Sequence, residues 1–194
     1  MKKKIDVKNA TMKAFPLPVT LVTCMDKKGN PNIITVTYVT GVNEEPPMVA
    51  IAIRPEKYSN KLIRETKEFA INVPTKELLS KIDYCGSFSG QEVDKFAETG
   101  LNTDKASVIQ TPLIKECPIS LECKLVKTIH FPSHDLFVGE VVAVHVEKEL
   151  LLDEIPDFSR LCFLLTTFFD YREIGKKVGT AFKEHDSCSD FKLL

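Results

Sequence analysis

The chain has 194 residues, of which 43% are hydrophobic and 27% are charged, and its formal net charge is −1 at pH 7. This composition is typical of a globular protein with a substantial core, and it excludes a largely disordered chain. The near-neutral charge, with Lys2, Lys3 and Lys4 as the one basic cluster, argues against nucleic acid as a partner.

The start of the chain predicts no export signal, because Asp6 and Lys8 interrupt any apolar stretch after the lysines. The longest apolar run, residues 161–169, is too short to cross a membrane, so no membrane partner is predicted. We therefore expect a cytoplasmic protein in which the six cysteines stay reduced. Their spacing matches no structural zinc motif, and no metal site is predicted.

Apolar runs bounded by turn residues predict a mainly β fold with a few short helices. The first two strands are joined by a tight turn in which Gly29 and Asn30 tolerate positive φ. The expected strands cover residues 17–25, 33–40, 48–54, 69–73, 119–126, 136–147 and 161–169. Many strands with frequent turns indicate a small barrel.

Two serines are placed to begin helices. Ser59 can accept the first free amide hydrogens of a helix predicted at residues 58–66. Ser89 and Glu92 have the spacing of a capping box, which predicts a helix that begins at Ser89 and carries Val93 and Phe96. Because helix N-termini attract anions, both places are candidate phosphate sites.

The strands between residues 33 and 73 each divide into an apolar face and a face of small or polar side chains, because side chains on a strand alternate. The smaller faces carry Thr35 and Thr37, then Ala50, Ala52 and Arg54, then Ala70 and Asn72. One donor per strand with space around it suits a polar cofactor. The alternative is a half-exposed sheet whose solvent face is small and polar by chance.

Several single residues are candidates for ligand contacts. Arg54 with Ser59 could hold a phosphate, although a surface arginine beside an ordinary helix cap is the alternative. His134 is expected at a strand entrance, and Tyr38 and Phe137 offer aromatic surfaces for a flat ring, where core packing is the alternative. Cys85 lies in a predicted loop, where its thiol could be exposed.

Common nucleotide and hydrolase motifs are missing from the sequence. It contains neither the G-x-G-x-x-G fingerprint nor the phosphate loop of nucleotide hydrolases, and neither a serine elbow nor a His-Glu-x-x-His motif. A flavin protein remains the most economical interpretation, since the flavin itself carries electron chemistry.

Seven segments together resemble the flavin reductase-like proteins, most closely the flavoredoxin branch. The segments are 18–23 (PVTLVT), 46–51 (PPMVAI), 83–86 (DYCG), 89–90 (SG), 94–96 (DKF), 116–118 (ECP) and 134–141 (HDLFVGEV). The resemblance spans roughly residues 15–182. It implies an FMN-binding split barrel of Greek-key topology that works as a homodimer with two flavins near the subunit interface.

We expect the chain to divide into three parts, as follows. Residues 1–14 form an N-terminal extension and residues 15–169 form the split-barrel domain. Residues 170–194 form a tail that packs on the barrel or on the dimer partner.

The resemblance implies roles for individual residues of a flavin site. It places Thr35, Val36, Thr37 and Tyr38 beside the ribityl chain and ring, and Arg54 and Ser59 at the phosphate. Asn72, Ser89, Gly90 and Lys95 fall near the same pocket, and His134 with Phe137 falls on the open side of the ring, where a nicotinamide would stack. Many members carry tryptophan where this chain has Tyr38.

The sequence therefore predicts a noncovalent FMN protein that passes electrons from NAD(P)H, a transient co-substrate, to flavin or a small-molecule or protein acceptor. No side chain is expected to act as a catalytic acid or base. One alternative is an electron-transfer protein of the flavoredoxin type without direct NAD(P)H activity. A second is a small β-barrel that binds another phosphorylated ligand and does no redox chemistry.

Overall fold

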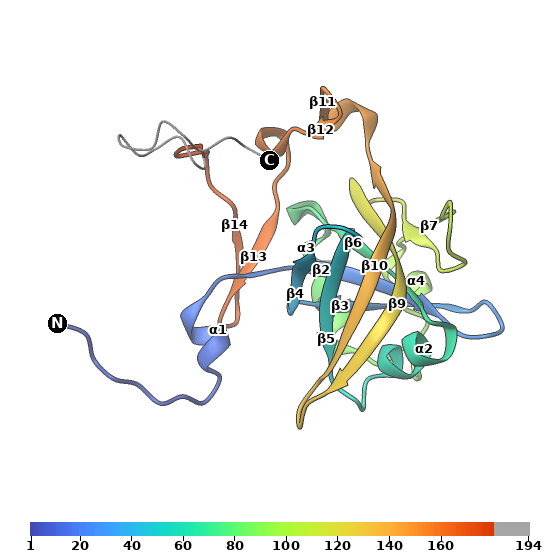
Figure 1. The fold of residues 1–194 in the computed structure, drawn as a ribbon, viewed down its shortest axis with the longest axis horizontal. Helices are drawn as coiled ribbons and strands as arrows, with labels where there is room; N and C mark the ends of the chain where they lie inside the picture. Colours follow the sequence, from blue (N-terminus) through green and yellow to red (C-terminus); the bar gives the residue numbers. More distant parts are fainter. Residues whose placement is uncertain (181–194) are drawn as a thin grey trace.

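A computed structural model describes residues 1–180 of the chain, and residues 181–194, part of the predicted tail, lie outside the described residues (Figure 1). Its main feature is a seven-stranded antiparallel sheet in the order β3-β2-β6-β9-β10-β5-β4. These strands are β2 (Thr20–Met25), β3 (Pro31–Val36), β4 (Val39–Asn43), β5 (Met48–Ile53), β6 (Glu68–Val73), β9 (Ile119–His130) and β10 (Asp135–Val146). The mainly β split barrel predicted from the sequence is confirmed.

The sheet closes through the short connection between β3 and β4. These strands are the two outermost of the sheet, yet only Thr37 and Tyr38 separate them along the chain. A connection this short spans only about 10 Å, so the sheet must curl until its ends approach each other. The predicted strand 33–40 is therefore wrong in one respect. It is interrupted at Thr37 and Tyr38, where the chain passes from one edge strand of the sheet to the other.

Short helices and small strand pairs surround the sheet. Helix α2 (Tyr58–Thr66) has the bounds expected from the sequence. The other elements are α1 (Ala10–Ala14), β1 (Leu17–Pro18), η1 (Lys76–Leu78), α3 (Leu79–Ser87), α4 (Lys95–Thr99), β7 (Thr103–Asp104), β8 (Leu113–Ile114), η2 (Lys148–Leu150), β11 (Leu151–Leu152), β12 (Ile155–Pro156), η3 (Phe158–Arg160), β13 (Leu164–Thr167) and β14 (Asp170–Glu173). No helix among residues 1–180 is both long and apolar enough to cross a membrane.

An arm stands beside the barrel and is formed by α1, β13 and β14 (Figure 1). Strand β13 pairs with β1 on one side and with β14 on the other, so the arm is tied to the start of the barrel domain. The predicted boundary between residues 169 and 170 falls in the turn that joins β13 to β14.

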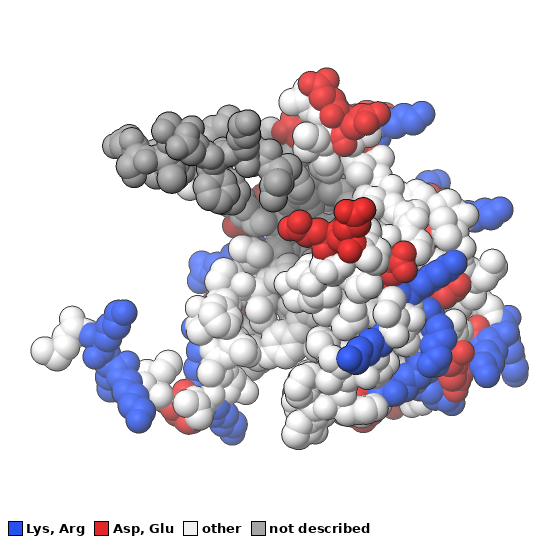
Figure 2. All heavy atoms as spheres, viewed as in Figure 1, with Lys and Arg blue, Asp and Glu red and all other residues white. Residues whose placement is uncertain are grey.

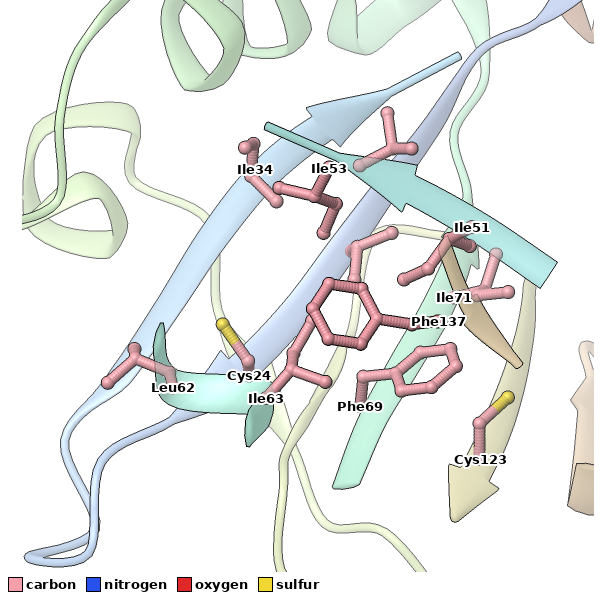
Figure 3. Close-up of a cluster of buried hydrophobic side chains, with 12 residues drawn as sticks. Cys24, Ile34, Ile51, Ile53, Leu62, Ile63, Phe69, Ile71, Cys123 and Phe137 are labelled. Carbon is pink, nitrogen blue, oxygen red and sulfur yellow. The ribbon is translucent and has the colours of Figure 1, made fainter. Parts of the chain in front are cut away.

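The barrel interior is filled by aliphatic and aromatic side chains from both halves of the sheet (Figure 3). Phe137 on β10 lies directly opposite Ile51 on β5, and both are fully buried. Cross-strand neighbours share a face, so Phe137 points into the barrel with Ile51. The prediction that Phe137 lies on the open side of a flavin ring is therefore wrong, and Phe137 is a core residue.

A second core lies between the outer face of the sheet and helix α3. Leu21 and Ile33 from the sheet pack there with Ile82 and Cys85 from the helix. Cys85 is fully buried, and burial raises the pKa of its thiol to about 11. The prediction that Cys85 lies in an exposed loop is wrong, because the segment forms the last turns of α3 and turns this side chain inward.

Glu122 is a fully buried carboxylate on β9 that holds a loop against the sheet. It accepts hydrogen bonds from the amides of Ser107, Val108 and Ile109 at 2.6–2.9 Å, and its Oε1 lies 2.6 Å from Nε2 of His145. Burial alone would raise the pKa of Glu122, but hydrogen bonds from Ser107, Ile109 and His145 lower it to about 2.

Glu122→Gln is expected to lower the free energy of unfolding at neutral pH by about 2–3 kcal/mol, since the carboxylate form carries these bonds. The folded pKa lies below the unfolded pKa, so this contribution is complete above the unfolded value and is lost as the pH falls through the folded value. Urea unfolding of both proteins at neutral pH and near about pH 3 measures this difference. A difference of equal size at both pH values would contradict this account.

Candidate functional site

A hollow of about 380 Å³ lies at the seam of the barrel, beside the connection between β3 and β4. This volume is in the range of ordinary small-molecule sites. It is lined by Asn9, Met12, Ile34, Thr35, Val36, Thr37, Tyr38, Ala52, Ile53, Arg54, Lys57, Ser133 and His134. We call it the seam hollow.

The segment from Thr35 to Tyr38 forms one wall of the seam hollow. Within residues 1–180 the hydroxyl of Thr37 has no hydrogen-bond partner, whereas the hydroxyl of Thr35 donates to the carbonyl of Ile82 at 2.5 Å. Ala52 opposite contributes a small side chain and donates its amide to the carbonyl of Tyr38 at 2.9 Å. The wall therefore offers a free hydroxyl and open space to a ligand.

An aromatic pair and a cation border the same hollow. The rings of Tyr38 and His134 lie 5.3 Å apart between centroids and are tilted by 57°. Arg54 follows β5 with a side chain that is 61% exposed, and its nearest ionic partner is Glu56 at 3.8 Å. Burial and the charge of Arg54 lower the pKa of His134, so its imidazole is largely neutral near pH 7.

A second and much smaller hollow, of about 10 Å³, lies beside the first, and Ile34 and Lys57 line both. We call it the lysine hollow. Its other lining residues are Asn32, Tyr58, Ser59, Gly86, Phe88, Ser89, Gly90 and Lys95. The structure thus brings Ser59, Ser89, Gly90 and Lys95 together, and it places Thr35, Val36, Thr37, Tyr38, Arg54 and His134 in the adjoining seam hollow.

Lys95 is a buried cation that lines the lysine hollow. It is only 4% exposed, and its Nζ donates to the carbonyls of Ile33 at 2.8 Å and Cys85 at 2.7 Å. Burial lowers the pKa of Lys95, which means that the ammonium is held in an unfavourable environment. A bound anion would compensate this charge, and the first amides of the neighbouring helix α2 favour negative charge as well.

Asn32 and Gly90 complete this hollow and make a close contact. A Cβ atom placed on Gly90 would lie 2.0 Å from Oδ1 of Asn32, so any larger residue would force the Asn32 side chain to move. The Nδ2 of Asn32 donates to Oγ of Ser59 at 2.8 Å. Sequence reasoning missed Asn32 because the strand was expected to begin one residue later; a polar residue at the start of an apolar strand was the available signal.

Both predicted serine caps are wrong. Helix α2 is preceded by Lys57, and Ser59 lies inside its first turn with its hydroxyl engaged by Asn32. No helix begins at Ser89; α4 begins after Asp94, whose Oδ1 accepts from the amides of Phe96 and Ala97. Aspartate is as good a helix cap as serine, and here it satisfies two amides at once.

Asn72 lines neither hollow. It is fully buried, donates to the carbonyl of Leu21, and accepts from the amide of Ile114 and the hydroxyl of Ser120. Strand β2 lies between β6 and β3, so Asn72 is separated from the seam although it shares the outer face with Thr35. The prediction that Asn72 lies near the ligand is wrong, because its amide supports the sheet.

The charge of the two hollows favours an anionic ligand. Within the described part of the chain, their lining residues include Arg54, Lys57 and Lys95 but no carboxylate. A hollow with buried cationic and amide donors next to a hollow with a free hydroxyl and an aromatic wall suits a flat molecule that carries a phosphate. The residues present therefore fit FMN.

Together, this fold and paired hollow define a split-barrel protein of the flavin-binding class. The model of the flavin reductase like domain matches residues 12–164. The chain belongs to the flavin reductase-like family and falls in its flavoredoxin branch.

Three similar proteins place the chain within this family. The flavoredoxin of Methanosarcina acetivorans is 33% identical with a TM-score of 0.87, and the alignment covers 96% of this chain and 98% of that chain. The flavoredoxin of Desulfovibrio vulgaris (Miyazaki F) is 29% identical with a TM-score of 0.87, covering 95% and 99%. The reductase component of an FADH(2)-dependent resorcinol hydroxylase from Rhizobium sp. is 26% identical over 140 residues, or 71% of this chain and 75% of that protein.

Proposed function

We propose that this protein binds FMN noncovalently across the two hollows and passes electrons from NAD(P)H to flavin or to a downstream acceptor. The single observation that carries the proposal is the buried ammonium of Lys95 beside the seam hollow, with Ile34 and Lys57 shared between the linings of the two hollows. Family membership and the likeness to flavoredoxins support flavin as the ligand.

The phosphate would lie where the two hollows meet, held by Lys57 and the first amides of helix α2, with the positive charge of Lys95 beside it. The ring and ribityl chain would lie along the wall from Thr35 to Tyr38, where Thr37 has a hydroxyl to donate. FMN, when bound, supplies the capacity to take up a hydride and release electrons. The protein orients the ligand, excludes water from one side, and provides nearby positive charge.

His134 would meet the nicotinamide at the mouth of the seam hollow. Its pKa is lowered, so it presents a neutral ring and adds no charge against the cation of an oxidised nicotinamide. Holding donor and acceptor in contact can by itself supply most of the barrier reduction in hydride transfer.

The likeness to two flavoredoxins favours a second candidate function, in which FMN exchanges electrons between partner proteins without direct NAD(P)H activity. Anaerobic mixing of the FMN-loaded protein with NADH or NADPH separates the two, with dithionite as the control for complete reduction. We expect the flavin absorbance to bleach with a nicotinamide. Bleaching by dithionite alone would support the electron-transfer function, and a protein that does not quench FMN fluorescence would contradict both.

We also propose that the protein works as a homodimer with flavins near the subunit interface. The arm exposes apolar side chains, among them Phe169 at 71% exposure, and the face shown in Figure 2 over β4, β5 and β10 carries few charged residues. Large exposed apolar areas are typical of interfaces. A molar mass in solution of a single chain would contradict this proposal.

Arg54→Ala is expected to weaken FMN binding by about 1 kcal/mol, or about fivefold, since Arg54 is a charged but largely exposed contact. Fluorescence titration with FMN measures the change, and raising the salt concentration should shrink it because exposed charges are screened. Glu56→Gln is the matched control, since it removes the ionic partner of Arg54 and leaves the arginine in place. Unchanged FMN affinity in Arg54→Ala would contradict a role for Arg54.

A further inference from the structure

A buried carboxylate network lies directly behind the turn that carries His134. Asp135 is 2% exposed, and its carboxylate accepts hydrogen bonds from Nδ2 of Asn60 at 2.8 Å and from the guanidinium of Arg64 at 2.7 Å. Nδ1 of His130 lies 2.6 Å from the other oxygen of the same carboxylate. All three partners converge on one side chain, so Asp135 is fully bonded.

The network joins three elements that border the candidate site. Asn60 and Arg64 belong to helix α2, whose start lines the lysine hollow. His130 and Asp135 are the two residues that flank the turn between β9 and β10, and they pair with each other across it. Asn60 also donates to the carbonyl of Ile53, the residue before Arg54. The turn is thus connected to both the helix and the end of β5.

Arg64 holds this arrangement in a defined geometry. Its Nε donates to Oδ1 of Asn60 at 2.9 Å while its Nη2 binds Asp135, and its guanidinium carbon lies 5.5 Å from the centroid of the Phe137 ring. A planar guanidinium that binds two partners at once restricts their relative positions more than a lysine would. The turn residues 131–133 are exposed, and the network adds side-chain bonds to the backbone pairing of Asp135 with His130 and with Ile53.

We propose that Arg64 and Asp135 are positioning residues that hold the β9–β10 turn so that His134 faces the seam hollow. The expected effect on flavin reduction rests on the proposed function, whereas the placement of His134 can be measured without flavin. Helix α2 is itself fixed by Leu62 and Ile63 in the barrel core. Loss of the network should therefore loosen the turn, whose ends stay paired in the sheet, while leaving the lysine hollow intact.

Titration of the His134 imidazole by NMR in the flavin-free protein tests the placement, with the resonance assigned from a His134→Gln variant. Arg54 and Glu56 are the charged groups that face His134. In Asp135→Asn the pKa of His134 should rise toward that of a free histidine, because the ring moves into water. The pKa should rise in Arg64→Ala as well, where loss of a cation acts in the same direction as movement of the ring. Removing the negative charge of Asp135 would by itself lower this pKa, so a rise in Asp135→Asn reports movement of the ring.

The matched control is Lys61→Ala, which removes a cation from the same helix without touching Asp135, since Lys61 pairs with Glu65. It should leave the His134 titration unchanged. Arg64→Lys should restore only part of the wild-type value, because a lysine cannot bind Asn60 and Asp135 in the same fork. Near-ultraviolet circular dichroism confirms that each variant is folded.

In the FMN-loaded protein, Arg64→Ala should slow flavin reduction at saturating NAD(P)H by about tenfold while FMN affinity stays within about twofold. If the pKa of His134 and the reduction rate both match wild type in the folded variants, the proposal is overturned. If NAD(P)H does not reduce the flavin of the wild-type protein, the proposed NAD(P)H activity is wrong. The NMR titration of His134 then decides by itself whether Arg64 and Asp135 position His134.

Discussion

Lys95→Met is expected to weaken FMN binding by about 10- to 150-fold, the equivalent of losing a charged hydrogen bond of about 1.5–3 kcal/mol. The side chain keeps its length, so the change removes the ammonium with little loss of packing. Within residues 1–180 the buried ammonium of Lys95 bonds only to two backbone carbonyls, and a phosphate beside the lysine hollow would be the anion that balances it. Fluorescence titration of the purified variant with FMN measures the loss.

Lys61→Met is the matched control for this variant, because Lys61 is exposed on helix α2 and lines neither the seam hollow nor the lysine hollow. Its FMN affinity should equal that of wild type. Thermal unfolding should show that Lys95→Met remains folded, since relief of the desolvation cost of a buried charge offsets part of the loss of its two hydrogen bonds to backbone carbonyls. A folded Lys95→Met variant with wild-type FMN affinity would show that Lys95 takes no part in FMN binding.

Phe137→Ala is expected to lower the free energy of unfolding by about 3–5 kcal/mol, the usual cost of truncating a buried aromatic side chain. Phe137 is fully buried among Ile51, Phe69 and Ile71 in the barrel interior (Figure 3), so the smaller side chain would leave a cavity. Urea unfolding of the flavin-free protein measures this loss.

Phe131→Ala gives the control for this variant, since Phe131 is 53% exposed and should change the free energy of unfolding by less than about 0.5 kcal/mol. Phe137→Leu keeps most of the volume and should bind FMN with wild-type affinity, because the residue lies inside the barrel. A folded Phe137→Leu variant with strongly impaired FMN binding would restore Phe137 to the ligand site and contradict the core assignment.

The alternation of side chains was sufficient to predict much of the barrel. Ile51 and Ile53 share a face in the sequence pattern and do point into the core together, while Ala52 faces the seam hollow. The bounds of helix α2 also followed from local residues. These features depend on near neighbours along the chain, which a single sequence contains.

The errors arose where tertiary position decides the role of a residue. Asn72 shares a face with Thr35, but strand β2 lies between them. The amide of Ile114 donates a hydrogen bond to Asn72, which therefore stabilises the sheet and does not line the site. Phe137 faces inward because of its register against Ile51. Strand order and register depend on contacts between distant segments, so alternation within one strand could not reveal them.

Other features had no local signal that could identify them. The Gly90 backbone approaches Asn32 across 58 residues of sequence, and Arg64 reaches Asp135 across a still longer separation. The resemblance to the flavin reductase-like proteins brought Gly90 and Lys95 into the candidate site although neither residue type alone indicates a ligand. Their shared hollow is explained only by the packing of α4 against β3.

Parallel titration of the protein with FMN and with riboflavin shows whether a phosphate-binding flavin site is present, because riboflavin has the same ring and lacks the phosphate. If the buried ammonium and the amides of α2 hold the phosphate, the fluorescence of FMN should be quenched with a stoichiometry of one flavin per chain. FMN should also bind at least about tenfold more tightly than riboflavin. Equal affinity for the two flavins, or no binding of either, would contradict the presence of this site.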